Sequence, residues 1–140
     1  MEEIQNKLKQ HFDVKFCKPK DFIGLDIDHK DNGTITLSMR TFTSKLQETF
    51  HLTNAAPIST PGRTDRKIIR GLDPLPDTTY RSKVGSLMWT TMGIRFDITY
   101  AVKELSRVLQ EPTTIAGEIL QRTLDYVAQT KEAFLEYNLF

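Results

Sequence analysis

The feature that most limits how this chain can fold is a long stretch without hydrophobic periodicity at residues 53–79. Four of the six prolines of the chain lie in this stretch, together with Gly62, Gly71 and a group of basic residues: Arg63, Arg66, Lys67 and Arg70. Connections inside compact domains usually run to about four to six residues. We therefore expect an exposed, mobile linker with little apolar surface for docking, joining two lobes that move independently.

The segment before the linker carries the pattern of a β-hairpin. Apolar residues alternate over residues 23–27 and again over residues 35–39, and Asn32-Gly33 lies between the two runs. An Asn-Gly pair between alternating runs is the strongest short-range signal for a hairpin. Gly24 interrupts the first run, where the lack of a Cβ lets another backbone approach closely or simply marks a bulge.

Other segments have helical spacing. We expect helices over residues 2–12, over the segment that carries Phe42 and Phe50, and over residues 80–91, 97–109 and 114–127. The expected N-caps are Ser38 or Thr41, Asp97, and Thr113 or Thr114, in chain order. Residues 12–16 and 134–139 alternate as strands, and the second of these has no evident partner.

Together these patterns predict an α+β fold. It consists of a β-hairpin with flanking helices at residues 1–52, a linker at 53–79, a small helical bundle at 80–130 and a lone strand at 131–140.

Charge and cysteine content say more about the cellular compartment of the protein than about its function. The 19 Lys and Arg residues against 18 Asp and Glu residues leave a net charge of +1, far from a strongly basic protein. The single cysteine, Cys17, fits a reducing compartment, and no stretch approaches the roughly 20 apolar residues of a membrane span. We expect an intracellular protein, cytoplasmic or nuclear, without a membrane partner.

The sequence offers no catalytic residues and no metal site. Polymerases hold two divalent ions with clustered carboxylates, and this chain has no Asp-Asp pair. Asp26 and Asp28 would share one face of a strand, but that face is more simply the solvated side of the hairpin. With one cysteine and three scattered histidines there is no zinc spacing either. We expect no cofactor and no polymerase activity in this chain alone.

A series of motifs resembles the reverse transcriptases of copia-type LTR retrotransposons. The series begins with residues 22–27 (FIGLDI), 33–38 (GTITLS) and 59–61 (STP), and its most specific part is residues 80–89 (YRSKVGSLMW). It continues through residues 94–98 (IRFDI), 101–102 (AV), 105–107 (LSR), 112–113 (PT) and 122–126 (RTLDY). Order and spacing are similar over nearly the whole chain, downstream of the position where the family carries its catalytic Tyr-Val-Asp-Asp.

Some positions depart from the family pattern. Phe96 stands where proline is usual, Ala116-Gly117 stand where His-Trp is usual, and Gln121 and Asp125 replace basic residues. These departures look like drift in a decaying copy, although a divergent active lineage would show some of them too.

The resemblance implies the end of a palm, a thumb with the start of the connection, and the first strand of an RNase H-like part. Its partners would be an RNA/DNA hybrid or duplex and the missing palm, fingers and RNase H parts of the same polyprotein. Mg²⁺ would be needed only in the intact polymerase. The hairpin resembles the primer grip, with Gly24 against the primer backbone, and the candidate phosphate contacts on the helices are Arg81, Lys83, Arg95, Lys103 and Arg107.

Two alternatives stay open at this point. Each basic residue can be an ordinary solvated charge on an amphipathic helix. The chain as a whole can be an inactive remnant that serves as a non-catalytic nucleic-acid-binding or protein-interaction module.

Overall fold

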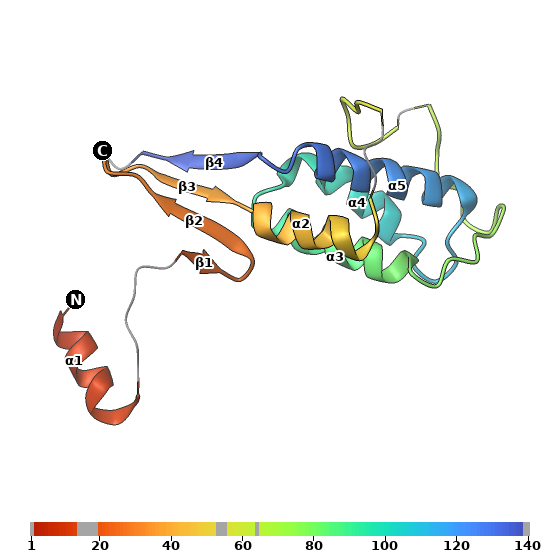
Figure 1. Cartoon of the computed structure of the whole chain (residues 1–140). Coiled ribbons are helices and arrows are strands. Elements are labelled where there is room, and N and C mark those ends of the chain that lie inside the picture. The colour runs from red at the N-terminus through yellow and green to blue at the C-terminus, as the bar shows by residue number, and fades with distance from the viewer. Residues whose placement is uncertain (1, 14–19, 53–55, 64, 139–140) are drawn as a thin grey trace.

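The computed structural model describes residues 2–13, 20–52, 56–63 and 65–138. Its order of elements is mixed α and β, with a four-stranded antiparallel sheet at one end and packed helices at the other (Figure 1). The predicted α+β class is therefore confirmed. The strand expected over residues 12–16 falls largely on positions 14–19, outside the described residues.

The central pair of strands is the predicted hairpin. Strand β2 (Leu25–His29) pairs with β3 (Ile35–Ser38), and the turn between them places Gly33 at a φ of 84°. Glycine reaches this left-handed conformation without a Cβ clash. The Asn32 side chain accepts a hydrogen bond from the Thr34 backbone N–H at 3.0 Å, which fixes the turn.

Strand β1 (Asp21–Phe22) adds a hairpin that the alternation did not predict. Ile23 and Gly24 form the two-residue turn between β1 and β2, with φ values of 54° and 79°. Two positive φ values are typical of the turn whose twist matches that of antiparallel strands. The run of residues 23–27 is therefore a turn followed by a strand.

The last strand, β4 (Phe134–Tyr137), does have a partner. It pairs antiparallel with β3, from Ile35 opposite Tyr137 to Ser38 opposite Phe134. The expectation of a lone strand was wrong because its partner lies about a hundred residues earlier in the chain, where no local pattern can reveal it.

Helix α2 (Arg40–Thr49) follows the sheet and is capped by it. Neither Ser38 nor Thr41 supplies the predicted cap, and the N-cap residue, Met39, makes no side-chain cap bond. Instead, an Asp26 carboxylate oxygen on β2 accepts a hydrogen bond from the Thr41 backbone N–H at 3.0 Å. Asp26 thus joins β2 to the start of α2.

Replacing Asp26 with alanine should lower the free energy of unfolding by about 1 kcal/mol, because a helix N–H loses its acceptor. Asp26→Asn retains an acceptor oxygen and should lose less. Urea unfolding followed by circular dichroism measures both variants. Equal stability of Asp26→Ala and the parent protein would show that this cap contributes nothing.

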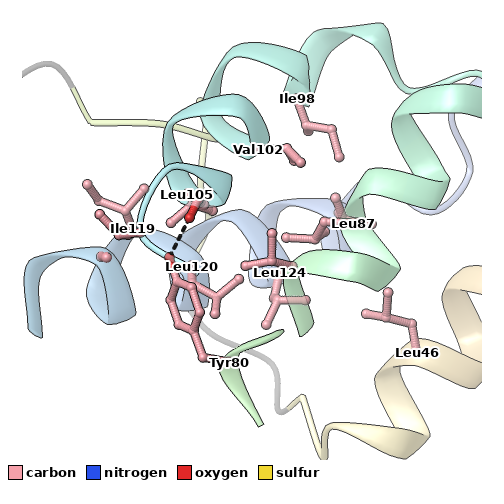
Figure 2. Close-up of a cluster of buried hydrophobic side chains, with 13 residues drawn as sticks. Leu46, Tyr80, Leu87, Ile98, Val102, Leu105, Ile119, Leu120 and Leu124 are labelled. Atoms are coloured by element: carbon pink, nitrogen blue, oxygen red, sulfur yellow. Dashed lines mark hydrogen bonds between the residues drawn. The ribbon is translucent and has the colours of Figure 1, made fainter. Parts of the chain in front are cut away.

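The core lies among the helices after the linker. Helix α3 (Tyr80–Gly93), the 3-10 helix η1 (Phe96–Ile98), α4 (Thr99–Ser106) and α5 (Thr114–Gln129) surround a cluster of fully buried side chains (Figure 2). Thr113 caps α5 by accepting from the Ala116 N–H at 3.2 Å, as predicted. Asp97 does not cap α4, because its carboxylate is bonded to Arg95.

Helix α2, which precedes the linker, packs on the same core as the helices that follow it. Leu46 of α2 is 3% exposed and belongs to the buried cluster, and Phe42 and Phe50 pack against it. The predicted domain boundaries stay a prediction.

The linker is fastened to α5 by polar contacts. Thr123 Oγ1 donates to the Pro61 carbonyl at 3.0 Å, and Arg122 Nε donates to the Thr60 carbonyl at 3.1 Å. Farther along, the Thr114 N–H donates to the Asp73 carbonyl at 2.9 Å, and Leu75 packs against the core. The expectation that the linker has little surface with which to dock was wrong, because its backbone carbonyls accept hydrogen bonds from α5 and its Ile68 and Leu75 side chains pack against the core.

Helix α1 (Glu2–His11) forms at the predicted place, apart from the other elements in Figure 1. Its apolar positions Ile4 and Leu8, and Phe12 just beyond its end, are 64%, 40% and 64% exposed. The helical spacing was therefore predicted correctly, and the rest of the described chain leaves the apolar face of α1 uncovered.

Candidate nucleic-acid interface

Gly24 lies in a tight intramolecular contact. A Cβ on this residue would lie 3.2 Å from Nε1 of Trp89 on α3 and 3.8 Å from Cδ2 of Phe42 on α2. Together with its positive φ, this contact explains why glycine occupies the position. Packing between the turn and the helices therefore accounts for Gly24 without a primer backbone.

Arg95 is buried, with its side chain only 4% exposed. Its Nε and Nη2 atoms donate to the two carboxylate oxygens of Asp97 at 3.0 and 2.8 Å, and Nη2 also donates to Thr130 Oγ1 at 2.7 Å. Nη1 donates to the Thr130 carbonyl, and the guanidinium lies 5.5 Å from the Tyr126 ring centroid. This placement does not fit the expected phosphate contact, because the donors of Arg95 are already used inside the protein.

The same cluster shifts the ionisation of its members. Burial acts to raise the pKa of Asp97, but the hydrogen bonds and charge of Arg95 outweigh it and hold the pKa below its ordinary value. The pKa of Tyr126 is raised, first by burial and then by its hydrogen bond to Asp97. The cluster is a structural joint between η1 and the end of α5.

On α3, Arg81 and Lys83 differ in availability. The Arg81 side chain is exposed and donates from Nε to the Leu109 carbonyl at 3.1 Å. Lys83 Nζ lies 3.2 Å from an Asp77 carboxylate oxygen, and both side chains are about three-quarters buried. Hydrogen bonds from Thr79 and Lys83 lower the pKa of Asp77, the Thr79 bond being the larger cause. Arg81 is therefore the freer cation.

On α4 and just after it, Lys103 and Arg107 both point to solvent. Lys103 is 66% exposed and Arg107 is 57% exposed, and the two flank Glu104 at 3.5 and 2.9 Å. Exposed ion pairs of this kind are weak and easily exchanged for another anion. Of the six residues selected from the sequence, Arg81, Lys103 and Arg107 are thus accessible cations.

The structure places further basic residues, from the linker, near the basic residues of α4. Arg63, Arg66 and Lys67 of the linker line a hollow together with Arg107, and Arg70 lines a second hollow with Arg107. Sequence reasoning recognised these residues as a basic group in the linker. Their position beside α4 was not predicted, because no sequence pattern shows which helix a linker packs against.

The carboxylates and histidines of the described residues do not gather into a metal-binding cluster. No group of three or more His, Cys, Asp or Glu side chains among these residues could hold a metal ion. Asp26 is engaged in capping α2, and Asp28 is exposed. No helix among the described residues is long and apolar enough to cross a membrane.

Comparison with known proteins relates the chain to transposon proteins. It is 33% identical over 96% of its length to the putative transposon Ty5-1 protein of Saccharomyces cerevisiae. It is 33% identical over 89% of its length to the Pol polyprotein from transposon RE2 of Arabidopsis thaliana. It is 28% identical over 91% of its length to that from transposon TNT 1-94 of Nicotiana tabacum. The chain is thus related to a segment of retrotransposon Pol polyproteins.

The chain spans 46% of the yeast relative and 8% and 10% of the two plant polyproteins. No protein-family model and no solved structure matches it.

Proposed function

We propose that this chain is the part of a copia-type reverse transcriptase that holds primer and template, without the residues that perform phosphoryl transfer. The observation that carries the proposal is the ordered series of motifs, above all residues 80–89 (YRSKVGSLMW). The relationship to retrotransposon Pol polyproteins over most of the chain supports it. The proposed setting is cytoplasmic or nuclear.

The structure suggests how such a part would grip a hybrid. The sheet and the helical core are joined by α2, by the Gly24 turn and by β4, so that the helices are held at a fixed position relative to the hairpin. Arg81, Lys103 and Arg107 would then present exposed positive charges to phosphates, and such phosphate contacts fix the position of the nucleic acid without reading its sequence. Lys83 would contribute less, because Asp77 neutralises it.

The catalytic carboxylates and their two divalent ions would belong to the preceding palm and fingers, and an RNase H part would follow. In that arrangement those carboxylates would hold Mg²⁺, which would supply the stabilisation of charge that phosphoryl transfer needs. The role of this chain is to keep the hybrid in place while that chemistry proceeds.

The test is binding of an RNA/DNA hybrid, measured by fluorescence anisotropy over a range of salt concentrations. Each neutralised phosphate contributes about −0.9 to the slope of log K against log salt, so three contacts give a slope of about −2 to −3. Arg81→Ala should reduce the steepness by about 0.9. Lys45→Ala, which removes an exposed charge from α2, is the matched control and should leave the slope unchanged.

A slope near zero, or one that Arg81→Ala does not change, would contradict this function and favour the non-catalytic interaction module. One observation favours that second reading. Three large apolar or aromatic side chains that are close in sequence are strongly exposed, and such side chains are typical of protein-interaction surfaces. They are Met92 on α3, Phe96 on η1 and Tyr100 on α4, with exposures of 80%, 63% and 72%.

A further inference from the structure

A groove runs between the linker and α4. Its two larger hollows have volumes of about 510 and 200 Å³, and a narrow hollow lined by Arg70 and Arg107 adjoins both. We call these three hollows the linker groove. Its basic lining residues are Arg63, Arg66, Lys67 and Arg70 from the linker and Arg107 from the turn after α4.

The charge of this groove is positive. Two carboxylates, Glu104 and Glu111, line it against five cations. Three cations are paired: Arg63 with Asp65, Arg66 with Glu118, and Arg107 with Glu104. Among the described residues, no carboxylate forms an ion pair with Lys67 or Arg70. Lys67 and Arg70 are both exposed linker residues, and their positive charges attract an anion that carries several charges.

An exposed aromatic side chain lies at the other wall. Tyr100 of α4 lines the hollow that contains Lys67 and is 72% exposed. The Lys103 ammonium lies 5.7 Å from its ring centroid, so the ring is flanked by positive charge on this side as well. An exposed ring beside a basic groove is the combination with which proteins bind single strands, where unpaired bases stack on the ring.

We propose that the linker groove binds single-stranded nucleic acid, with Lys67, Arg70 and Arg107 against the phosphates and Tyr100 stacked on a base. A duplex does not suit this site, since its bases are already stacked on one another and cannot cover Tyr100. The inference rests on the proposed function only in that both require a polynucleotide partner. It adds a second path for a strand, on the linker side of α4.

The test uses the full chain and a fluorescein-labelled oligo(dT) of about 12 nucleotides, a length within the range that one small domain covers. Each phosphate contact to a single strand contributes about −0.7 to the salt slope. Lys67→Gln/Arg70→Gln should therefore reduce the steepness by about 1.4 and weaken binding about 25-fold at 0.1 M salt. Lys45→Gln/Lys131→Gln removes the same net charge from exposed positions outside the groove and should change affinity only slightly.

Tyr100→Ala separates stacking from charge. It should weaken binding of oligo(dT) by about 5- to 150-fold, since base stacking is worth about 1–3 kcal/mol, and leave binding of an abasic strand of equal length unchanged. Circular dichroism checks that each variant is folded. Unaltered oligo(dT) binding by Lys67→Gln/Arg70→Gln would overturn the proposal, and so would equal effects of Tyr100→Ala on both strands.

The two proposals fail separately. If hybrid binding depends on Arg81 but oligo(dT) does not bind, the groove is not a single-strand site while the proposed function stands. If oligo(dT) binds through Lys67, Arg70 and Tyr100 but the hybrid does not bind, the groove stands and the proposed grip on a hybrid is wrong.

Discussion

Replacing Leu105 with alanine should lower the free energy of unfolding by about 2–5 kcal/mol, more than any other single change considered for this protein. Leu105 is completely buried between α3 and α5, and its backbone carbonyl accepts a hydrogen bond from the buried Tyr80 hydroxyl at 3.0 Å (Figure 2). Deleting its branched side chain leaves a cavity at the centre of the cluster. Domains of this size are stable by only about 5–15 kcal/mol, so a large part of that stability would be lost.

Guanidinium unfolding monitored by circular dichroism measures the loss. Met92→Ala is the matched control, because Met92 is 80% exposed and its truncation should change stability by no more than about 0.5 kcal/mol. Similar stabilities of the two variants would show that the cluster around Leu105 is not the core.

Arg95→Ala should have the second largest effect, a loss of about 2–3 kcal/mol. Its guanidinium makes four hydrogen bonds, to Asp97 and Thr130, and removing it takes four donors away from their oxygens and leaves Asp97 with its hydrogen bond to Tyr126. The expected loss of stability is smaller than for a fully buried ion pair, because the Asp97 side chain is 42% exposed and water can partly replace the arginine. Arg81→Ala, an exposed arginine on α3, is the control and should be nearly neutral.

The pH dependence distinguishes this ion pair from simple packing. Since the pKa of Asp97 is lower in the folded protein than its ordinary value of 3.8, the pair contributes its stability above about pH 4. That contribution is lost as the pH falls through the depressed pKa. Stability of the parent protein should therefore fall more steeply below pH 4 than that of Arg95→Ala. Parallel pH profiles would mean that Arg95 stabilises the fold through packing alone.

Features determined within a few residues were predictable from the sequence. The Asn32-Gly33 turn, the Thr113 cap and the spacing of the helices each depend on near neighbours, and the structure has them where the patterns indicated. The turn at Ile23-Gly24 is also local, but it was not predicted, because the apolar Ile23 extends the alternating pattern of β2 by one more position. Isoleucine is uncommon at positive φ, so residue type argued against the turn.

Features that depend on distant contacts were not predictable. Arg95 looked like a free cation because Thr130, 35 residues away, is one of its partners. The pairing of Arg95 with Asp97 is local, but Asp97 also fitted the pattern of a helix cap, and the sequence does not decide between the two. The basic residues of the linker become part of a candidate site only because the fold places them beside Arg107, which the sequence does not show. The sequence therefore predicted that the candidate site consists of exposed basic residues, but not which basic residues come together in it.

The residues of α5 that differ from the family pattern make specific contacts in the structure. A Cβ at Gly117 would lie 2.5 Å from Cδ2 of Leu75, so the glycine makes room for the linker at this point. Gln121 donates from Nε2 to Asp125 Oδ1 at 3.0 Å, which links two of the unusual residues to each other. Burial raises the pKa of Asp125 against the lowering effect of that bond. The substituted residues therefore fit one another and the linker.

The pairing of β4 with β3 affects the order in which a ribosome-made chain can fold. Lys30 and Glu136, which form a 2.7 Å ion pair across this part of the sheet, are 106 residues apart in the chain. At about 5–20 residues per second, synthesis needs about 5–20 s to deliver β4 after β3 has emerged. During that interval the outer edge of β3 has its backbone groups unpaired and is open to other strands. The helices between them fold from nearby contacts in far less time, so β4 closes the sheet last, onto an edge that the nascent chain must keep unoccupied.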